Sequence, residues 1–200
     1  GSLDDTSAVA REAGADHVVR APVNQGLARA FSVGLAFALH RGADIIVNTD
    51  ADNQYRGDNI AKLIEPILHH EADIVIGNRN PHRIAHFSMF KRALQWLGSW
   101  LVRGLSQTTI PDVTSGFRAF SREAALRMNV VSDFTYTLET IIQAGKKQLF
   151  VTHVDVDVNP ARRPSRLFSG TRSYVLRSVA TIVRIYALYE PLRVFTFIGG

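Results

Sequence analysis

A string of short oxygen-bearing side chains follows directly after the apolar, β-branched run at residues 45–47. That run suits a strand buried on both faces of a parallel sheet, and ligands of open α/β sheets bind just beyond the carboxyl ends of such strands. Asp50 and Asp52 flank a small alanine, so a turning chain can aim both carboxylates at one hard cation, and Gln54 adds a neutral oxygen. Mg²⁺ or Mn²⁺ bound in this way keeps open positions for the phosphates of a nucleotide. The alternative is an acidic turn that caps the next helix, which is the commoner origin of an isolated D-x-D.

The charge balance narrows the class of partner. The chain has 200 residues, 46% of them hydrophobic, which is enough for one well-buried domain. Its 23 Lys and Arg against 18 Asp and Glu give a net charge of +5, which suits phosphorylated substrates or acidic lipid headgroups. We expect no nucleic-acid partner, because the basic residues gather late in the chain without a recognition motif. The absence of Cys excludes disulfides, thiolate metal sites and a Cys nucleophile.

Hydrophobic periodicity predicts helices and strands that alternate through the first half of the chain. We expect helices at residues 7–13, 27–40 and 59–70, and strands at residues 17–20, 44–48 and 73–77. Alternation at this spacing implies right-handed βαβ units, hence an α/β fold with a mostly parallel sheet.

The regular alternation of helices and strands ends after Arg79. A long apolar helix is predicted at 87–105, either as ordinary core or as a surface near a lipid acceptor. The later elements are a loop and strand at 108–120, a helix capped by Ser121 and reaching Met128, a helix at 134–144 ended by Gly145, and an alternating strand at 151–158. Because that last strand alternates strictly, we expect one of its faces to be solvated or the strand to lie at a sheet edge.

Several short motifs, in a fixed order, resemble the family 2 glycosyltransferases and, within them, the polyprenyl-phosphate (dolichyl-phosphate) sugar synthases. The opening G-S-L-D-D-T is similar to the end of the family's D-D-G-S-x-D-x-T turn, and N-Q-G-L-A-R-A at 24–30 to its N-x-G-x-x-x-A helix start. D-A-D-N-Q at 50–54 matches D-A-D-x-Q, and G-N-R at 77–79 stands where the family has G-S-R. D-V-T-S-G-F-R at 112–118 matches D-x-T-S-G-F-R, and residues 162–166 resemble R-x-x-S-[KR].

The resemblance implies a GT-A nucleotide-diphospho-sugar transferase fold with a central sheet flanked by helices. It implies that Asp50, Asp52 and Gln54 hold Mg²⁺ or Mn²⁺, and that the donor is a GDP- or UDP-sugar. The substrate-binding positions that it carries over are Asn78, Arg79, Ser115, Gly116, Phe117, Arg118, Arg163, Ser165 and Arg166. The family's first strand and its V-I-P-x-x-N-E turn are expected before Gly1. Tyr55-Arg56-Gly57 replaces the family's common His/Asp-Pro after the metal motif.

Arginines suit the chemistry that this family performs. Sugar transfer from a nucleotide diphosphate must stabilise a departing diphosphate, to which arginine offers planar, bidentate donors. Arg79 after a strand and Arg118 after a glycine-containing turn are candidates, with solvated surface arginines as the alternative. Arg163 and Arg166 lie in a Pro- and Ser-punctuated loop suited to closing over the donor or holding an acceptor phosphate.

Asp112 is the candidate for a role at the reacting centre. A hydroxyl acceptor needs a carboxylate to take its proton, whereas a phosphate acceptor is already anionic and would need Asp112 only for positioning. Glu139 is a weaker candidate, because a glutamate on a helix surface needs no special explanation. The histidines receive no role, since they lack the spacing of metal ligands.

The C-terminal segment indicates where in the cell the protein acts. Residues 174–188 place apolar side chains on one helical face and arginines on another, which suits a helix in the headgroup plane or a core helix with solvated arginines. Pro191 breaks this pattern, and the apolar run that follows is shorter than the roughly 20 residues that span a bilayer. The resemblance implies transmembrane helices beyond Gly200. We expect the catalytic domain at 1–168, and a juxtamembrane helix with the start of a transmembrane region at 169–200.

The expected function is therefore metal-dependent, inverting transfer of a sugar to a polyprenyl (dolichyl or undecaprenyl) phosphate. The expected location is the cytoplasmic face of a membrane with an anionic surface, with a homo-oligomer as a further partner. One rival is a family 2 enzyme that glycosylates a hydroxyl of a lipid or polysaccharide. The other is a fragment that binds anionic ligands or membrane without turnover.

Overall fold

The computed structural model describes residues 1–80, 110–132 and 135–160, together with residues 180, 181, 183, 184, 187–192 and 196 near the C-terminus. The predicted helix at 87–105 and most of the predicted helix at 174–188 lie outside the described residues. The same holds for three predicted site residues, Arg163, Ser165 and Arg166.

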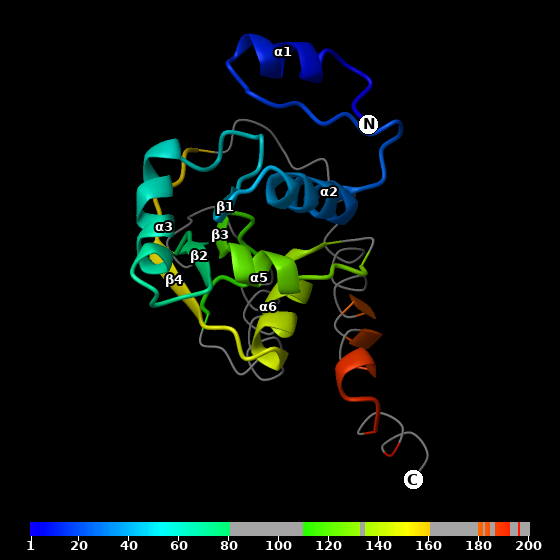
Figure 1. Ribbon diagram of the computed structural model, residues 1–200, viewed down its shortest axis with the longest axis vertical. Helices are drawn as coiled ribbons and strands as arrows, with labels where there is room; N and C mark the ends of the chain where they lie inside the picture. The colour runs from blue at the N-terminus through cyan, green and yellow to red at the C-terminus, as the bar shows by residue number, and fades with distance from the viewer. Residues whose placement is uncertain are drawn as a thin grey trace.

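A mixed sheet forms the centre of the described chain (Figure 1). Its strands are β1 (Ile45–Asn48), β2 (Ile74–Asn78), β3 (Arg118–Ser121) and β4 (Val151–Asp155), arranged in the order β1-β3-β2-β4. β1, β2 and β4 run in one direction, as expected for a mostly parallel sheet, but β3 runs against them and lies between β1 and β2. The carboxyl ends of three strands therefore meet the amino end of β3 at the same end of the sheet.

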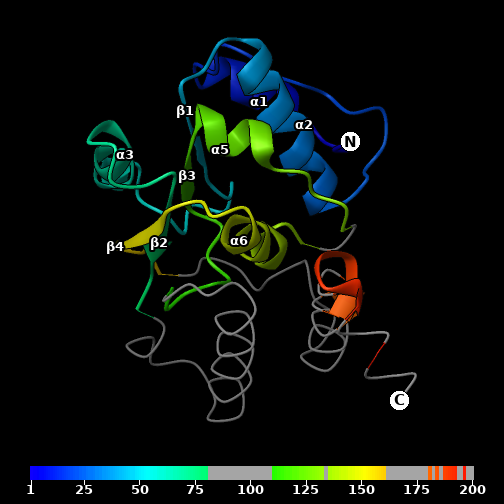
Figure 2. The ribbon, with the colours of Figure 1, turned by 60° about the horizontal axis from the view of Figure 1, so that its bottom comes forward.

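The two faces of the sheet pack against different helices, as Figure 2 shows. Val75 and Ala119 point toward α3 (Ile60–Leu68), which follows the 3-10 turn η1 (Gly57–Asn59). Ile74, Ile76 and Phe120 point to the opposite face. That face is covered by α2 (Leu27–His40), α5 (Arg122–Arg127) and α6 (Thr137–Lys146). Alternate side chains of each strand thus build two cores, which hold the sheet between two helical layers.

Local signals account for most helix boundaries. α2 has the predicted bounds and begins after Gly26, whose positive φ of 85° is easily adopted by glycine. The predicted cap of α5 is confirmed, because the Ser121 hydroxyl accepts a hydrogen bond of 3.1 Å from the Ala124 amide. α6 runs through Gly145 to Lys146, so the predicted end at residue 144, with Gly145 as the terminator, is wrong by two residues.

The N-terminal segment lies apart from the sheet (Figure 1). It holds α1 (Thr6–Glu12), which buries no residue. The predicted strand at 17–20 is absent, because these residues have no neighbouring strand among those described and instead bring His17 edge-on to Phe37, with ring centroids 5.6 Å apart.

The two outer strands differ from each other in how well the sequence anticipated them. β1 was expected to be buried on both faces, but it is half-buried, since within the described sheet it pairs with β3 alone. β4 lies at the other edge of this sheet, as predicted, and its side chains from Thr152 to Asp155 alternate between half-buried and exposed.

The described C-terminal residues contact the main body at two points. Glu190 forms an ion pair with Lys146 at the end of α6, and Tyr189 packs against the core on that side of the sheet. Helical residues 187–189 give way at Glu190, immediately before Pro191, as predicted. In the portion of the chain that the structure covers, no helix has the length and apolar character needed to cross a bilayer.

Candidate functional site

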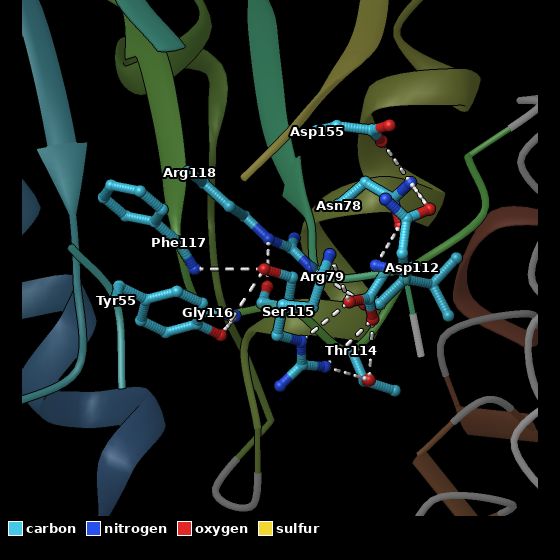
Figure 3. Close-up of polar contacts among 12 residues, drawn as sticks. Tyr55, Asn78, Arg79, Asp112, Thr114, Ser115, Gly116, Phe117, Arg118 and Asp155 are labelled. Carbon is cyan, nitrogen blue, oxygen red and sulfur yellow. Dashed lines mark hydrogen bonds and ion pairs between the residues drawn. The ribbon is translucent and has the colours of Figure 1, made fainter. Parts of the chain in front are cut away.

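Two loops meet at the end of the sheet where β1, β2 and β4 finish. We call residues 49–55, which follow β1, the carboxylate loop, and residues 112–117, which precede β3, the glycine loop. Asn78 and Arg79 enter the same region from β2. Figure 3 shows how Tyr55 of the carboxylate loop reaches the glycine loop, with Arg79 and Asp112 on its other side. The topology thus gathers all the described members of the predicted site.

The carboxylate loop is a tight turn anchored beside β4. The Asp52 carboxylate accepts a hydrogen bond of 3.0 Å from the Gln54 amide, and Asn53 has a positive φ of 61°, which asparagine tolerates. Asn159, beyond β4, donates through its backbone to the Gln54 carbonyl at 2.8 Å and through its side chain to the Asn53 carbonyl at 2.9 Å. These bonds fix the turn, while the Asp52 side chain stays exposed and Asp50 and Gln54 are half-buried.

The donor atoms of this loop fit a divalent cation. Burial raises the pKa of Asp50, and the nearby charge of Asp52 raises it further, whereas Arg79 and Arg118 oppose the shift. A bound cation would remove this repulsion between carboxylates, and the oxygen ligands suit Mg²⁺ or Mn²⁺. No cluster of three or more His, Cys, Asp or Glu that could hold a metal occurs among the described residues. Two carboxylates and an amide oxygen would fill only part of the coordination shell of the cation and would leave positions for phosphate oxygens.

Arg79 and Asp112 form a bidentate ion pair. Arg79 Nε donates to Asp112 Oδ2 at 2.7 Å and Nη2 to Oδ1 at 3.0 Å, while Thr114 bonds to both side chains. Asp112 is fully buried, and the Arg79 side chain is 16% exposed. Burial raises the pKa of Asp112, but the charge and hydrogen bonds of Arg79 outweigh it and hold the pKa below its ordinary value. Asp112 is thus a weak proton acceptor that orients the Arg79 guanidinium.

Asn78 ties the ends of β2 and β4 together. Its side-chain amide donates to Asp155 Oδ1 at 2.7 Å, and its carbonyl oxygen accepts from the Asn80 amide at 3.1 Å (Figure 3). This position is therefore built into the frame of the site next to Arg79.

Arg118 supports the glycine loop from inside. It is fully buried, which excludes the solvated surface arginine that the sequence allowed. Its guanidinium donates to the carbonyls of Val113, Ser115 and Thr137 at 2.8 Å each, and to Thr140 Oγ1 at 2.7 Å. Burial lowers the pKa of Arg118 to about 10, so it remains protonated at neutral pH. Arg118 thus fastens the glycine loop to α6.

The other predicted residues of the glycine loop are also buried. Ser115 Oγ accepts from the Phe117 amide at 3.3 Å, and the Phe117 ring stacks on Tyr55 with centroids 4.9 Å apart. Contact of Ser115, Gly116, Phe117 or Arg118 with a substrate stays a prediction. In the structure these residues are buried and support the glycine loop from its inner side.

Glu139 differs from its expected position on a helix surface. It is 1% exposed, because α6 is buried along most of its length. Its carboxylate accepts bonds of 2.9 Å from the amides of Val131 and Ser132, and one of 3.1 Å from the Gln143 side chain. Glu139 thus fixes the turn before α6 and has a structural role.

Three side chains that the sequence did not single out hold Gly116. Asn48, Tyr55 and Tyr136 all bond to its backbone. Asn48 and Tyr55 border the carboxylate loop and were discoverable as its neighbours. Tyr136 carried no signal, because a tyrosine at a helix start is usually ordinary core.

The comparisons with known proteins agree with this architecture. The family model described as glycosyl transferase family 2 matches residues 1–127. The undecaprenyl-phosphate mannosyltransferase of Micrococcus luteus is 29% identical over 183 residues, covering 88% of this chain and 74% of that protein. The UDP-N-acetylglucosamine–dolichyl-phosphate N-acetylglucosaminyltransferase of Methanococcus voltae is 33% identical over 141 residues, covering 66% of this chain and 55% of that protein.

A solved structure with the same fold is the glucosyl-3-phosphoglycerate synthase of Mycobacterium tuberculosis, in complex with Mn²⁺, uridine diphosphate and phosphoglyceric acid. It superposes with a TM-score of 0.71 at 20% identity over 94% of this chain and 64% of that one, which confirms the GT-A fold. The present chain thus spans between about half and three quarters of these three proteins. With more than half of its length matched by the family model, this chain belongs to glycosyl transferase family 2 and is a glycosyltransferase.

Proposed function

We propose that the protein transfers a sugar, with inversion, from a nucleotide-diphosphate sugar to a polyprenyl phosphate, and that the reaction depends on a divalent cation. One observation carries the proposal: a loop with paired carboxylates and a buried bidentate Arg79–Asp112 pair meet at one end of the sheet. The first suits the diphosphate of the donor and the second suits an anionic acceptor. In the reaction, the bond between the anomeric carbon and the nucleotide's phosphate oxygen breaks, and a bond to an acceptor phosphate oxygen forms.

Asp50, Asp52 and Gln54 would hold the cation. When bound, Mg²⁺ or Mn²⁺ neutralises charge that develops on the leaving diphosphate. The half-buried position of Asp50 and the exposed position of Asp52 give the ligand set one anchored and one accessible carboxylate. The chain's own contribution is to keep this turn closed through the bonds from Asn159.

Arg79 would receive the acceptor phosphate. Among the described residues its hydrogen bonds use Nε and Nη2, so Nη1 is available for a phosphate oxygen. Asp112 keeps the guanidinium in a fixed orientation. Because the pKa of Asp112 is lowered, it is poorly suited to take a proton from a hydroxyl, whereas a phosphate acceptor needs no base. This is the argument for phosphate over the rival hydroxyl acceptor.

Membrane association of the C-terminal part belongs to the same proposal. Val183, Leu188 and Leu192 are more than half exposed, and Arg184 beside them is exposed as well. Apolar side chains next to a cation suit an anionic bilayer surface, on the cytoplasmic face where nucleotide sugars would be found. We keep the division into a catalytic part at 1–168 and a juxtamembrane part at 169–200. Arg163, Ser165 and Arg166 remain candidates for closing over the donor, and a homo-oligomer remains a candidate assembly.

The names of related proteins support the acceptor and leave the donor open. Two relatives are named for transfer to undecaprenyl or dolichyl phosphate, and one of them for a UDP-sugar. The GT-A enzyme of known structure is named as a glucosyl-3-phosphoglycerate synthase, and at 20% identity it supports the fold alone, so a hydroxyl acceptor stays the rival to be tested.

The decisive experiment incubates the full-length protein with a panel of UDP- and GDP-sugars, with either polyprenyl phosphate or the corresponding free polyprenol. Products are identified by mass spectrometry, with and without a chelator. We expect a polyprenyl-phosphate sugar that forms only when a divalent cation is present. Product on the free alcohol alone would establish the rival enzyme. No product with any donor, from folded protein, would favour a fragment that binds without turnover.

A further inference from the structure

We infer that Asn48, Tyr55 and Tyr136 form a clamp on the Gly116 backbone that sets the position of the Asp50 carboxylate for metal binding. The inference rests on the proposed function, because it assigns positioning residues to the metal site proposed there. It concerns side chains that touch neither the proposed cation nor the proposed substrates.

Both polar backbone atoms of Gly116 are held by side chains from outside its own loop. Its amide donates to the Tyr55 hydroxyl at 3.2 Å (Figure 3). Its carbonyl accepts from Asn48 Nδ2 at 2.8 Å and from the Tyr136 hydroxyl at 3.3 Å. Asn48 also donates to the Tyr136 hydroxyl at 2.7 Å, so the three groups on the carbonyl side form one closed network.

The clamp itself is rigid. The Tyr136 ring lies parallel to Phe31 of α2, with centroids 3.9 Å apart, and Tyr55 stacks on Phe117. Tyr55 and Tyr136 are 7% and 1% exposed. Because each ring is buried and stacks on a neighbouring ring, it resists moving with the loop, and its hydroxyl helps to fix where Gly116 lies.

Gly116 is in turn pressed against Asp50. A methyl group added at Gly116 would lie 2.6 Å from Asp50 Oδ2 and 3.1 Å from both Cγ and Oδ1. A side chain at this position would have to displace the Asp50 carboxylate, so the glycine backbone is the wall against which the carboxylate rests. Asn48 and Tyr55 flank Asp50 in the sequence. The two residues that bond to the Gly116 backbone therefore also lie on either side of the carboxylate that rests against it.

This arrangement gives a physical reason for a glycine at position 116, where φ is not in the left-handed region. The reason is the close approach of a carboxylate and not the backbone conformation. It also links the two halves of the site, because the glycine loop that carries Asp112 cannot shift without releasing Asp50.

The first test is Gly116→Ala in the full-length protein, with Gly34→Ala as the matched control. Gly34 lies in α2 and nothing is within 4 Å of an added methyl group there. The added methyl at Gly116 should displace the flexible Asp50 side chain. We expect Mn²⁺ affinity, measured by electron paramagnetic resonance of free Mn²⁺ with UDP present, to fall about 10- to 100-fold, as is usual when support of a metal ligand is lost. The control should bind Mn²⁺ as the wild type does.

The second test removes only hydroxyl groups. Tyr136→Phe keeps the stacked ring and should weaken Mn²⁺ binding by about threefold, and Tyr55→Phe, which leaves the Gly116 amide without its partner, by about tenfold. Tyr189→Phe serves as control, because Tyr189 packs against the same core cluster as Tyr136, whereas the side-chain hydrogen bonds to Gly116 come from Asn48, Tyr55 and Tyr136. The effect of Tyr136→Phe should shrink in a Gly116→Ala background, since both changes act through the same contact.

The outcomes separate the inference from the proposed function. If the wild type binds Mn²⁺ and the variants Gly116→Ala, Tyr55→Phe and Tyr136→Phe bind it with the same affinity, the clamp is overturned and the proposed function still stands. The clamp is also overturned if the effects of Tyr136→Phe and Gly116→Ala on Mn²⁺ affinity are additive and Tyr189→Phe weakens Mn²⁺ binding as much as Tyr136→Phe does. That result would indicate a general loosening of the core. Failure of the wild type to bind Mn²⁺ overturns the metal site itself.

Discussion

The carboxylate loop and the glycine loop lie against each other, yet they are built in opposite ways. In the carboxylate loop, Asp52 is exposed, Asp50 is half-buried, and burial and like charge raise the pKa of Asp50. In the glycine loop, Asp112 is fully buried and its pKa is lowered by a paired arginine, although burial acts against this. The first loop keeps charge that is poorly compensated by the protein, and the second neutralises its charge internally. A bound cation would therefore offset charge in the first loop, whereas the Asp112 charge in the second is already offset by Arg79.

The largest effect is expected from substitutions in the carboxylate loop. Asp50→Ala or Asp52→Ala should abolish turnover and donor binding, a loss on the order of 10³-fold or more, because the charge on the leaving diphosphate is no longer offset. Gln54→Ala should be milder, since a neutral ligand contributes less. Donor binding can be followed by calorimetry and folding by circular dichroism. Undiminished turnover of Asp52→Ala after chelation would remove the metal from the reaction.

Breaking the second loop should affect stability first. Arg118→Met keeps the side-chain volume but leaves the carbonyls of Val113, Ser115 and Thr137 without their donor. We expect a loss of about 2–4 kcal/mol in the free energy of unfolding, measured with urea, because buried acceptors are left unpaired. Arg127→Met, at an exposed helix end, is the control. If Arg118→Met is as stable as this control, Arg118 does not hold the loop.

Asp112→Asn sharpens the comparison at the reacting centre. With a phosphate acceptor, the variant should keep appreciable activity without a new pH dependence, and the acceptor KM should rise because Arg79 is less firmly oriented. With a hydroxyl acceptor, loss of a general base would lower kcat by on the order of 10²–10⁴-fold. Steady-state rates across pH, at saturating donor, distinguish the two results. A loss of that size with unchanged donor binding would identify the rival enzyme.

The smallest expected effects are opposite shifts in the stability of the metal-free protein. The pKa of Asp50 is raised on folding, so its ionisation costs stability as pH rises above the ordinary value of about 3.9. The pKa of Asp112 is lowered, so its stabilising contribution is present above that ordinary value and is lost as pH falls through the lower folded pKa.

At neutral pH, Asp50→Asn should therefore raise the melting temperature of the metal-free protein, and Asp112→Asn should lower it. Differential scanning calorimetry with a chelator, at pH 7 and at pH 3, measures both shifts, and both should diminish at the lower pH. Shifts of the same sign at pH 7 would contradict the contrast between the two loops.

The two loops also differed in how much the sequence revealed. The D-x-D-x-Q spacing made Asp50, Asp52 and Gln54 candidate metal ligands, because ligand chemistry is carried by residue type and short spacing. The partners of Gly116 and Arg118 include Asn48 at the end of β1 and Thr137 at the start of α6, up to 68 residues away in sequence. Such contacts depend on topology, and the antiparallel insertion of β3 has no signature in hydrophobic periodicity. For the same reason Glu139 was expected on a surface, since nothing local indicates that α6 is buried on all sides.

The position of β3 between β1 and β2 bears on how the protein is made. β1 and β2 are synthesised early, but each has its partner in a strand that follows Asn48 by about 70 residues. Until residues 118–121 have left the ribosome, the facing edges of β1 and β2 have no strand between them. Nascent chains that stall in this interval would present unpaired, apolar strand edges, which are substrates for chaperones and seeds for aggregation. The Gly116 clamp and the Arg118 anchor are completed later still, because they also need Tyr136 and Thr137, which follow β3 in the chain.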